Sequence, residues 1–316
     1  MSSKRSWILL VVLILVAASL ACSSSSNENQ QVRTLVAPTT ETQKQEDTVA
    51  KSTDAPATDT PAPTPTQEIE GLVKVGTYLV GTDIQPGIYV GMAGGDLFSS
   101  CYWARLSNLT GSDNILANGN ATGLYYVEVL PSDKALETGC ELLPIEQVPA
   151  REAFLTTIPT GMYLVGTDIR PGIYVGMAGE DLSDSCYWAR LSNLTGSDNI
   201  LANGNATGLY YVEALPDDKA LETGCELLPI EQVLAREAFL TTLPTGIYLV
   251  GRDIEAGMYR GEAGNDILDS CYWARLSNVN GDDNIIANDN AIGQYFIEVA
   301  ATDFALEVGC EVAKVE

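Results

Sequence analysis

The sequence predicts an all-β protein built from three tandem copies of a small, disulfide-bridged module with a β-sandwich or barrel-like fold. Three observations support this prediction. The octapeptide CYWARLSN occurs at residues 101–108, 186–193 and 271–278, each time 85 residues further on. In each copy, short runs of strand-forming residues alternate with turns rich in Gly, Asn and Pro. Six cysteines form three pairs, each with a separation of 39 residues.

The repeat defines the domain organisation. Residues 77–161 and 162–246 are identical at 76 of 85 positions, and residues 162–231 and 247–316 at 41 of 70. One unit of about 70 residues is therefore used three times. The modules are expected at residues 72–145, 159–230 and 244–316, with connectors at 146–158 and 231–243.

Strands and turns account for most of a module. In the first copy, GTYLV and GIYVGMA flank the turn GTDIQPG, whose proline and glycine suit a tight turn. CYWARLSN, LYYVEVL and the segment after Cys140 read as further strands. Residues 134–137 suggest a helical turn. In the connector, the apolar residues Ile230, Val233, Leu234 and Ala238 fit a short helix loosely, and Pro149 weakens that prediction in the first copy.

The N-terminus has the pattern of a secretory signal that ends at a cysteine. Lys4 and Arg5 precede an apolar run that leads through small residues to Cys22. This pattern resembles the lipobox of bacterial lipoproteins, which implies a signal peptide over 1–21 and a lipidated Cys22. The alternative is an uncleaved anchor, but the run is shorter than the roughly 20 residues that span a bilayer.

Residues 22–71 are predicted to be the lipidated cysteine and a disordered tether. The segment 23–70 is rich in Ser, Thr, Pro, Gln and acids and has no aromatic residue. Such a composition cannot bury enough apolar surface to offset its ordering entropy. As a coil it would hold the modules roughly 35–40 Å from the lipid. The expected location is extracytoplasmic, lipid-anchored to the cell membrane and exposed on the cell surface.

The chain is strongly acidic, with a formal net charge of −25. By direct count the charge is −6 over 76–160, −8 over 161–245 and −9 over 246–316, so every module is acidic. This charge repels nucleic acid and anionic lipid surfaces. Nucleic acid is therefore not an expected partner. The expected partners are the membrane, through lipid on Cys22, and a cell-wall glycan or surface protein.

The cysteines predict one disulfide within each module. Six cysteines allow 15 pairings, but a chain built by copying one unit should close each bridge inside its copy. The predicted bridges are Cys101–Cys140, Cys186–Cys225 and Cys271–Cys310. Zinc binding is disfavoured because each copy has only two cysteines, and the chain has no His and no CxxC motif.

The motifs GTYLVGTDIQPGIY, CYWARLSN, ILAN or IIAN, and the closing GC resemble a poorly characterised module. This module occurs singly or in tandem in secreted and lipid-anchored bacterial proteins. The similarity covers residues 76–316. It implies an envelope-exposed module and points to no particular activity.

Catalysis is not expected, and no cofactor is predicted. Histidine is absent, which removes Ser-His-Asp and Cys-His mechanisms. No copy shows two acids flanking an aromatic cleft motif of the glycosidase kind. The Asn and Asp clusters at GSDN and NGNATG favour tight turns. Calcium ligation by these oxygens is the alternative, although the spacing of a calcium loop is missing.

The repeated octapeptide allows two interpretations. In a strand, Cys101, Trp103 and Arg105 share one face. If that face is buried, Trp103 packs on the disulfide and Arg105 lies near the rim against a carboxylate such as Asp83. If it is exposed, it forms a platform for stacking on sugars or peptides. The candidate platform residues are Trp103, Arg105, Trp188, Arg190, Trp273 and Arg275.

Two classes of function follow. The first is a lipid-anchored envelope protein whose modules bind a cell-wall, glycan or protein surface. The second is a structural spacer or surface-coat array with no specific ligand. Exposure of the three module tryptophans separates the two classes, since a spacer has no reason to leave tryptophan in water.

Overall fold

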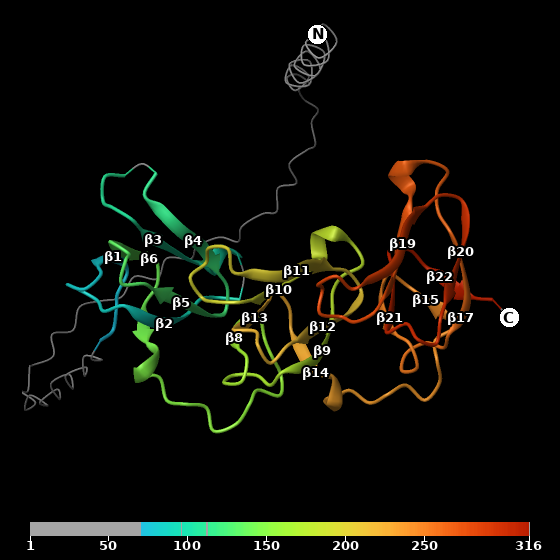
Figure 1. The fold of residues 1–316 in the computed structure, drawn as a ribbon, viewed down its shortest axis with the longest axis horizontal. Coiled ribbons are helices and arrows are strands. Elements are labelled where there is room, and N and C mark those ends of the chain that lie inside the picture. Colours follow the sequence, from blue (N-terminus) through green and yellow to red (C-terminus); the bar gives the residue numbers. More distant parts are fainter. Residues whose placement is uncertain (1–70, 96, 112, 316) are drawn as a thin grey trace, which may run out of the picture. The chain divides into compact units, whose positions relative to one another are not determined.

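The computed structural model describes residues 71–95, 97–111 and 113–315 (Figure 1). The expected signal peptide, Cys22 and nearly all of the tether lie outside these residues. The all-β prediction is confirmed, because the helical elements of the described residues are 3-10 turns of three residues each.

The same seven strands recur in each module. Module 1 contains β1 (Gly76–Leu79), β2 (Gly87–Met92), β3 (Cys101–Leu106), β4 (Ile115–Ala121), β5 (Leu124–Val129), β6 (Ala135–Thr138) and β7 (Leu142–Pro144). Module 2 contains β8 (Gly161–Leu164), β9 (Gly172–Met177), β10 (Cys186–Leu191), β11 (Ile200–Ala206), β12 (Leu209–Ala214), β13 (Ala220–Thr223) and β14 (Leu227–Pro229). Module 3 contains β16 (Gly246–Leu249), β17 (Gly257–Glu262), β18 (Cys271–Leu276), β19 (Ile285–Ala291), β20 (Gln294–Val299), β21 (Ala305–Val308) and β22 (Val312–Lys314), and β15 (Thr242–Leu243) precedes it. The 3-10 turns are η1 (Leu97–Ser99), η2 (Ile145–Gln147), η3 (Leu182–Asp184), η4 (Ile230–Gln232) and η5 (Ile267–Asp269).

Each module is a sandwich of two small antiparallel sheets. In module 1 the first sheet has the order β1-β6-β3-β4, and the second has the order β5-β2-β7. Buried side chains from both sheets fill the space between them. They include Tyr89, Cys101, Trp103, Tyr125, Val127, Leu136 and Leu142. The predicted sandwich of disulfide-bridged repeats is therefore confirmed.

A glycine and a tyrosine face each other across the second sheet of every module. Gly91 pairs with Tyr125 between β2 and β5. A Cβ on Gly91 would lie 2.4 Å from the Tyr125 ring, so no other residue fits there without moving the tyrosine. Glycine is needed at this position, because the tyrosine ring of the neighbouring strand occupies the space that a side chain would need.

Consecutive modules share sheets across their boundaries. Strand β5 of module 1 runs parallel to β8 of module 2, where Leu124 pairs with Gly161. Strand β12 of module 2 meets β16 of module 3 in the same way, where Leu209 pairs with Gly246. The second sheet of one module and the first sheet of the next thus form one seven-stranded sheet, and this occurs twice.

We call β5 and β12, which pair with a strand of the next module, the joining strands. The turn before each joining strand requires glycine. Gly123 has φ of +63°. A Cβ there would lie 1.9 Å from the carbonyl oxygen of Thr160 in the next module. The positive φ alone favours glycine, and the contact with module 2 makes any side chain impossible at the observed separation.

Two local predictions are wrong. Residues 134–137 form no helical turn, because Ala135–Thr138 is strand β6, paired on both sides with β1 and β3. The connector holds no packed helix beyond the turn η4, and Leu234 is 92% exposed. In both cases sheet pairing and chain reversal override a weak helical pattern.

Within the described ranges, no helix has the length and apolar character needed to cross a membrane.

Candidate functional site at the module junctions

The three predicted disulfides are present. Cys101 is bonded to Cys140, Cys186 to Cys225 and Cys271 to Cys310. The first cysteine of each pair begins the strand that carries the Trp and Arg of the octapeptide. Cys101 and Trp103 lie in the same buried cluster, as the core interpretation expects.

The arginine of the octapeptide forms a buried ion pair. The Arg105 Nε donates to Asp133 Oδ2 at 2.7 Å, and Nη2 donates to Oδ1 at 2.7 Å. Asp133 Oδ2 also accepts from the backbone N of Leu130 at 2.8 Å. Arg190 with Asp218 and Arg275 with Asp303 repeat this fork. Such a bidentate pair holds the guanidinium in one orientation.

The predicted partner of Arg105 is wrong. Asp83 instead accepts a hydrogen bond from the backbone N of Leu79 at 2.9 Å, within its own turn. The true partner stands 28 residues after the arginine in every copy. Only the pairing of β3 with β6 brings the strand and the turn before β6 together.

Arg105 and Arg190 each use a third nitrogen, Nη1, to form a hydrogen bond with the next module. The Arg105 Nη1 donates to the carbonyl oxygen of Thr195 at 2.7 Å. Arg190 Nη1 donates in the same way to Asn280 at 2.8 Å. We call residues 107–114, 192–199 and 277–284 the docking loops, and each internal one supplies this acceptor.

Two further contacts hold a docking loop. The backbone N of Glu128, on β5, donates to the carbonyl oxygen of Leu194 at 3.0 Å, and the backbone N of Glu213 donates to the carbonyl oxygen of Val279 at 3.0 Å. Trp103 packs on the glycine of the loop, where a Cβ on Gly196 would lie 2.3 Å from the indole ring. We call this Trp, this Arg and the Glu backbone N the docking site.

A buried tyrosine adds a side-chain contact at each junction. Tyr126 Oη donates to Asp168 Oδ2 of module 2 at 2.7 Å. Asp168 also accepts from the backbone N of Leu164 and from Arg151 of the connector. Burial, followed by the hydrogen bond to Asp168, raises the pKa of Tyr126 well above its usual value. Tyr211 and Asp253 repeat the contact at the second junction at 2.7 Å.

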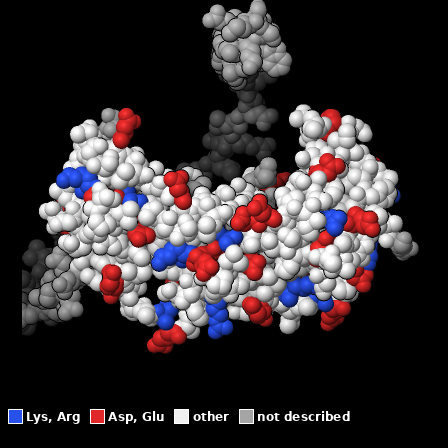
Figure 2. All heavy atoms as spheres, in the orientation of Figure 1, with Lys and Arg blue, Asp and Glu red and all other residues white. Residues whose placement is uncertain are grey.

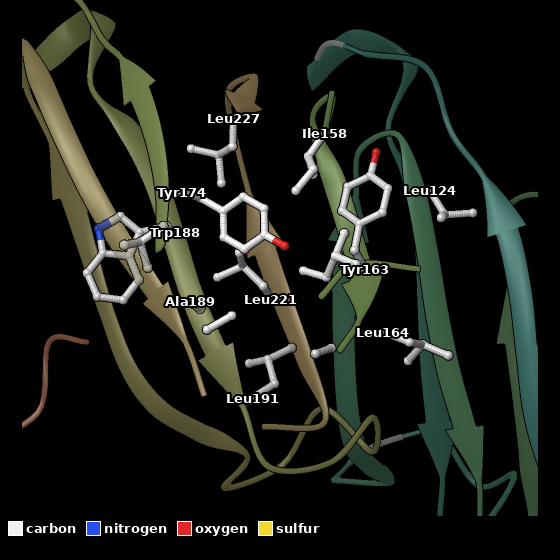
Figure 3. Packing of buried hydrophobic residues seen from close by; sticks show 14 of the residues in the cluster. Leu124, Ile158, Tyr163, Leu164, Tyr174, Trp188, Ala189, Leu191, Leu221 and Leu227 are labelled. Atoms are coloured by element: carbon white, nitrogen blue, oxygen red, sulfur yellow. The ribbon is translucent and has the colours of Figure 1, made fainter. Parts of the chain in front are cut away.

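Apolar side chains fill the rest of the junction. The second sheet of module 1 contributes Val90, Leu124 and Tyr126 to a cluster that also contains Leu164, Leu191 and Leu194 of module 2. Figure 3 shows Leu124 on one side of this cluster and the β8 residues Tyr163 and Leu164 beside it. The junction is therefore continuous with the core of module 2 rather than a loose contact.

A small groove remains beside each junction. Trp103, Asn118, Asn120 and Glu222 are among the residues that line the first, which has a volume of about 170 Å³. The second, of about 180 Å³, has the matching residues Trp188, Asn203, Asn205 and Glu307. Burial raises the pKa of Glu222 and of Glu307 above the ordinary value for glutamate.

Module 3 has a surface that corresponds to the surfaces by which modules 1 and 2 contact the next module, and we call it the outer face of module 3. Its residues differ from those at the two junctions. Gln294 replaces the leucine that begins the joining strand, Phe296 replaces the tyrosine, and Arg260 replaces the valine. Phe296 is 51% exposed. Trp273 and Arg275 are partly buried rather than buried. Hydrogen bonding to Arg275 lowers the pKa of Asp303 and raises the pKa of the arginine.

The predicted platform is wrong for modules 1 and 2. Trp103 is 7% exposed and Trp188 is 8% exposed, and Arg105 and Arg190 are buried in their ion pairs. The face they share points into the module and onto the next docking loop, so it offers no exposed platform to a ligand. Trp273 and Arg275 keep partial exposure because no described residue covers module 3 in the same way.

The predicted turn at GSDN lies in the docking loop, but the predicted turn at NGNATG is wrong for its asparagines, because Asn118 and Asn120 lie in strand β4 and pair with β3. Asn108 Oδ1 accepts from the backbone N of Thr110 at 2.9 Å, and Asn114 Nδ2 donates to the carbonyl oxygen of Asn108 at 2.9 Å. Asp113 has φ of +52°, which Asp tolerates better than most residues. In the described ranges, no group of three or more His, Cys, Asp or Glu side chains is placed to hold a metal ion.

Figure 2 shows acidic side chains spread over one face of the protein with basic side chains between them. The predicted repulsion of nucleic acid stays a prediction.

No curated protein matches the chain, and no solved structure matches it. The family of Rv1352-like extracellular domains matches it at residues 67–142, 156–227 and 241–311, which correspond to the three modules. The expected resemblance to a tandem module of secreted proteins is thereby confirmed, and the location of the modules is extracytoplasmic. The chain belongs to the family of Rv1352-like extracellular domains and carries three tandem copies of that domain.

Proposed function

We propose that this protein is a non-catalytic structural array, attached to the membrane through lipid on Cys22, in which three docked modules act as one unit. The observation that supports this proposal is the role of the repeated strand CYWARL at the junctions. Its Trp and Arg hold the docking loop of the next module at two junctions with the same contacts. A motif repeated for this purpose needs no ligand.

Docking of this kind makes the modules mechanically continuous. Each junction combines a shared sheet, an arginine-to-carbonyl bond, a tyrosine-to-aspartate bond and a buried apolar cluster. Interfaces between domains that are linked only by a flexible connector are smaller and more polar. A unit built in this way suits a spacer or a surface coat.

Unfolding of the soluble chain with Cys22→Ser tests the array. If the modules act as one unit, the chain unfolds in one transition, and Arg190→Ala lowers the stability of module 3 as well as module 2. Three independent transitions, with only one of them moved by Arg190→Ala, would contradict the proposal. Hydrogen exchange followed by peptide mapping resolves modules 2 and 3, because their β12 and β20 peptides differ in sequence.

The membrane attachment has its own test. Wild type and Cys22→Ser are expressed in a bacterial host and fractionated. The expected result is that wild type partitions with membranes and the variant does not. Equal partitioning of the two would show that lipid on Cys22 is not the anchor.

A second candidate function is binding of a small saccharide unit in the two grooves. The observation that favours it is the repeated lining of an indole edge, two asparagine side chains and a glutamate beside each junction. Amides and carboxylates are suited to sugar hydroxyls, and the groove volumes admit about one ring. Titration of the soluble chain with cell-wall saccharides, followed by tryptophan fluorescence, tests it, with Asn118→Ala and Asn203→Ala as the matched variants. A response that survives both substitutions would contradict this candidate.

A further inference from the structure

We propose that the docking site of module 3 binds the docking loop of module 1 in a second copy of this chain, so that copies associate head to tail. The inference rests on the proposed function, because it extends the docking chemistry of the array from within one chain to between two chains.

Module 3 keeps the donors of the docking site. Arg275 Nε and Nη2 donate to Asp303 at 2.6 and 2.8 Å, so the guanidinium is held as in the other two modules. Its Nη1 has no acceptor among the described residues, whereas the same atom of Arg105 and Arg190 donates to a docking loop. Trp273 and the backbone N of Glu298 occupy the other two positions of the site.

Module 1 keeps the matching docking loop. Residues 107–114 and 192–199 have the same sequence, SNLTGSDN. Leu109 of the first loop is 55% exposed, while Leu194 and Val279 of the internal loops are 1% and 3% exposed. A Cβ on Gly111 would meet nothing within 4 Å, whereas on Gly196 it would meet a tryptophan. The first loop therefore has the sequence of an occupied loop and repeats its Asn108–Thr110 and Asn114–Asn108 hydrogen bonds, but Leu109 is solvent-exposed.

The contact between copies is weaker than an internal junction. Phe296 has no hydroxyl to donate to Asp83, which stands where Asp168 and Asp253 stand in the other modules. Gln294 and Arg260 replace apolar residues on the outer face. The backbone-directed bonds and the indole contact remain, so the expected association is reversible rather than permanent.

The geometry of the contact leaves it open-ended. The surface of module 3 and the loop of module 1 are different patches, so each added copy presents a free loop and a free site. Copies attached to one membrane would meet at high local concentration, which favours a weak contact of this kind.

Sedimentation of the soluble mature chain with Cys22→Ser tests the proposal. The average mass is expected to rise with protein concentration, and more steeply at ~0.5 M salt, which screens the repulsion between acidic copies. A chain that stays monomeric up to roughly millimolar concentration overturns the proposal.

Two variants identify the surfaces. Leu109→Asp places a charge in the docking loop of module 1, at the position where the internal loops bury a leucine or a valine. Glu298→Pro removes the backbone donor of the docking site and leaves the Arg275–Asp303 pair intact. Proline is tolerated on an edge strand where the N–H points away from the sheet. Each variant alone is expected to associate at least roughly tenfold more weakly than wild type, as loss of a central contact predicts. The matched control is Leu201→Asp, at an exposed leucine of module 2, and it should associate like wild type.

Mixing the two variants gives the sharpest result. Leu109→Asp keeps its site on module 3, and Glu298→Pro keeps its loop on module 1. The mixture is expected to form dimers that neither variant forms alone, with no larger species. If association is unaffected by either substitution, or if the mixture stays monomeric, the head-to-tail contact is wrong.

A restoring variant separates a weak site from a blocked one. Arg260→Val, Gln294→Leu and Phe296→Tyr together give module 3 the outer face of the internal junctions. This triple variant should associate at lower concentration than wild type. If the triple variant assembles while wild type never does, the face of module 3 is a cap, and the proposal is overturned. Failure here would leave the array itself intact, because Arg190→Ala reports on the internal junction independently.

Discussion

The junction between modules 2 and 3 and the outer face of module 3 are built from the same strand sequence, CYWARL, but in different surroundings. At the junction, Arg190 and its carboxylate are 5% and 2% exposed. On the outer face, Arg275 is 24% exposed. The comparison shows that the identical motif serves as core and as interface at once, and that its neighbours decide how much of it is buried.

The residues around this motif also differ between the junction and the outer face. Tyr211 at the junction donates to Asp253, and the residue in its place on the outer face is Phe296. A repeat whose outer face is not covered by a further repeat commonly carries a more polar face there, because an apolar face would aggregate. Module 3 shows part of this change, since it gains Arg260 and Gln294 but keeps Trp273 and Arg275.

The largest expected effect comes from removing the two arginines separately. Arg190→Ala leaves Asp218 buried without its partner and breaks the bond to the carbonyl of Asn280. Loss of one member of a buried pair lowers the free energy of unfolding by about 3–5 kcal/mol. Arg275→Ala should cost about half as much, because water reaches that arginine. Chemical denaturation measures both, and equal losses would mean that the junction adds nothing to the pair.

The glycine of the docking loop gives the next effect. Gly281 and Gly111 both have positive φ, +79° and +99°, so alanine at either position costs about 1–2 kcal/mol of backbone strain. At Gly281 the added Cβ would also lie 2.4 Å from Trp188, whereas Gly111 is open. Overpacking adds about 1–3 kcal/mol. Thermal unfolding should therefore show a larger loss for Gly281→Ala than for Gly111→Ala. Similar losses at the two glycines would rule out the tryptophan contact.

The tyrosine contact predicts a smaller and one-sided effect. Tyr211→Phe removes the hydroxyl that donates to the carboxylate of Asp253, which should lower the free energy of unfolding by about 1.5–3 kcal/mol, the usual range for a bond to a charged group. The reverse change, Phe296→Tyr, should leave the stability of the dilute monomer within about 0.5 kcal/mol, since no described residue faces that position. A loss at Phe296→Tyr would show an unrecognised neighbour there.

The smallest effect concerns the partly buried glutamates Glu222 and Glu307 and has the opposite sign. Burial raises the pKa of Glu307 and of Glu222 above the unfolded value. Each carboxyl therefore favours the folded state when it is protonated, and this contribution is lost as pH rises from the unfolded pKa, about 4.3, through the raised folded value. Glu307→Gln should slightly increase stability at pH 7 and flatten its dependence on pH in that window. Glu137→Gln, at the matching position of module 1, is the control, and equal effects of the two would contradict a role for burial at the junction.

Asp303 acts in the other direction at low pH. Its pKa is lowered by Arg275, so the stability it contributes is present above the unfolded pKa and is lost as pH falls through the folded pKa. The protein is therefore expected to lose stability as pH falls below the ordinary pKa of an aspartate. The pH series for Glu307→Gln should stay above that pH, so that protonation of Asp303 does not add to the result.

The sequence alone determined the repeat, the strand-rich class and the disulfide framework, because each of these is local or is copied with the module. The 85-residue spacing and the cysteine pairs need no knowledge of how strands cross. The strand alternation also placed Cys101, Trp103 and Arg105 on one face correctly, since successive side chains point to opposite sides of a strand.

Only the tertiary structure decided what that face meets. The sequence offered Asp83 as the partner of Arg105, and the pairing of β3 with β6 selected Asp133 instead. The aspartate 28 residues after each arginine was visible as a repeated acid, but many acids repeat at the same spacing in a copied chain. The use of the Trp and Arg to hold the next docking loop was not visible at all, because a contact between modules depends on how two folded surfaces fit, and no local pattern records that fit.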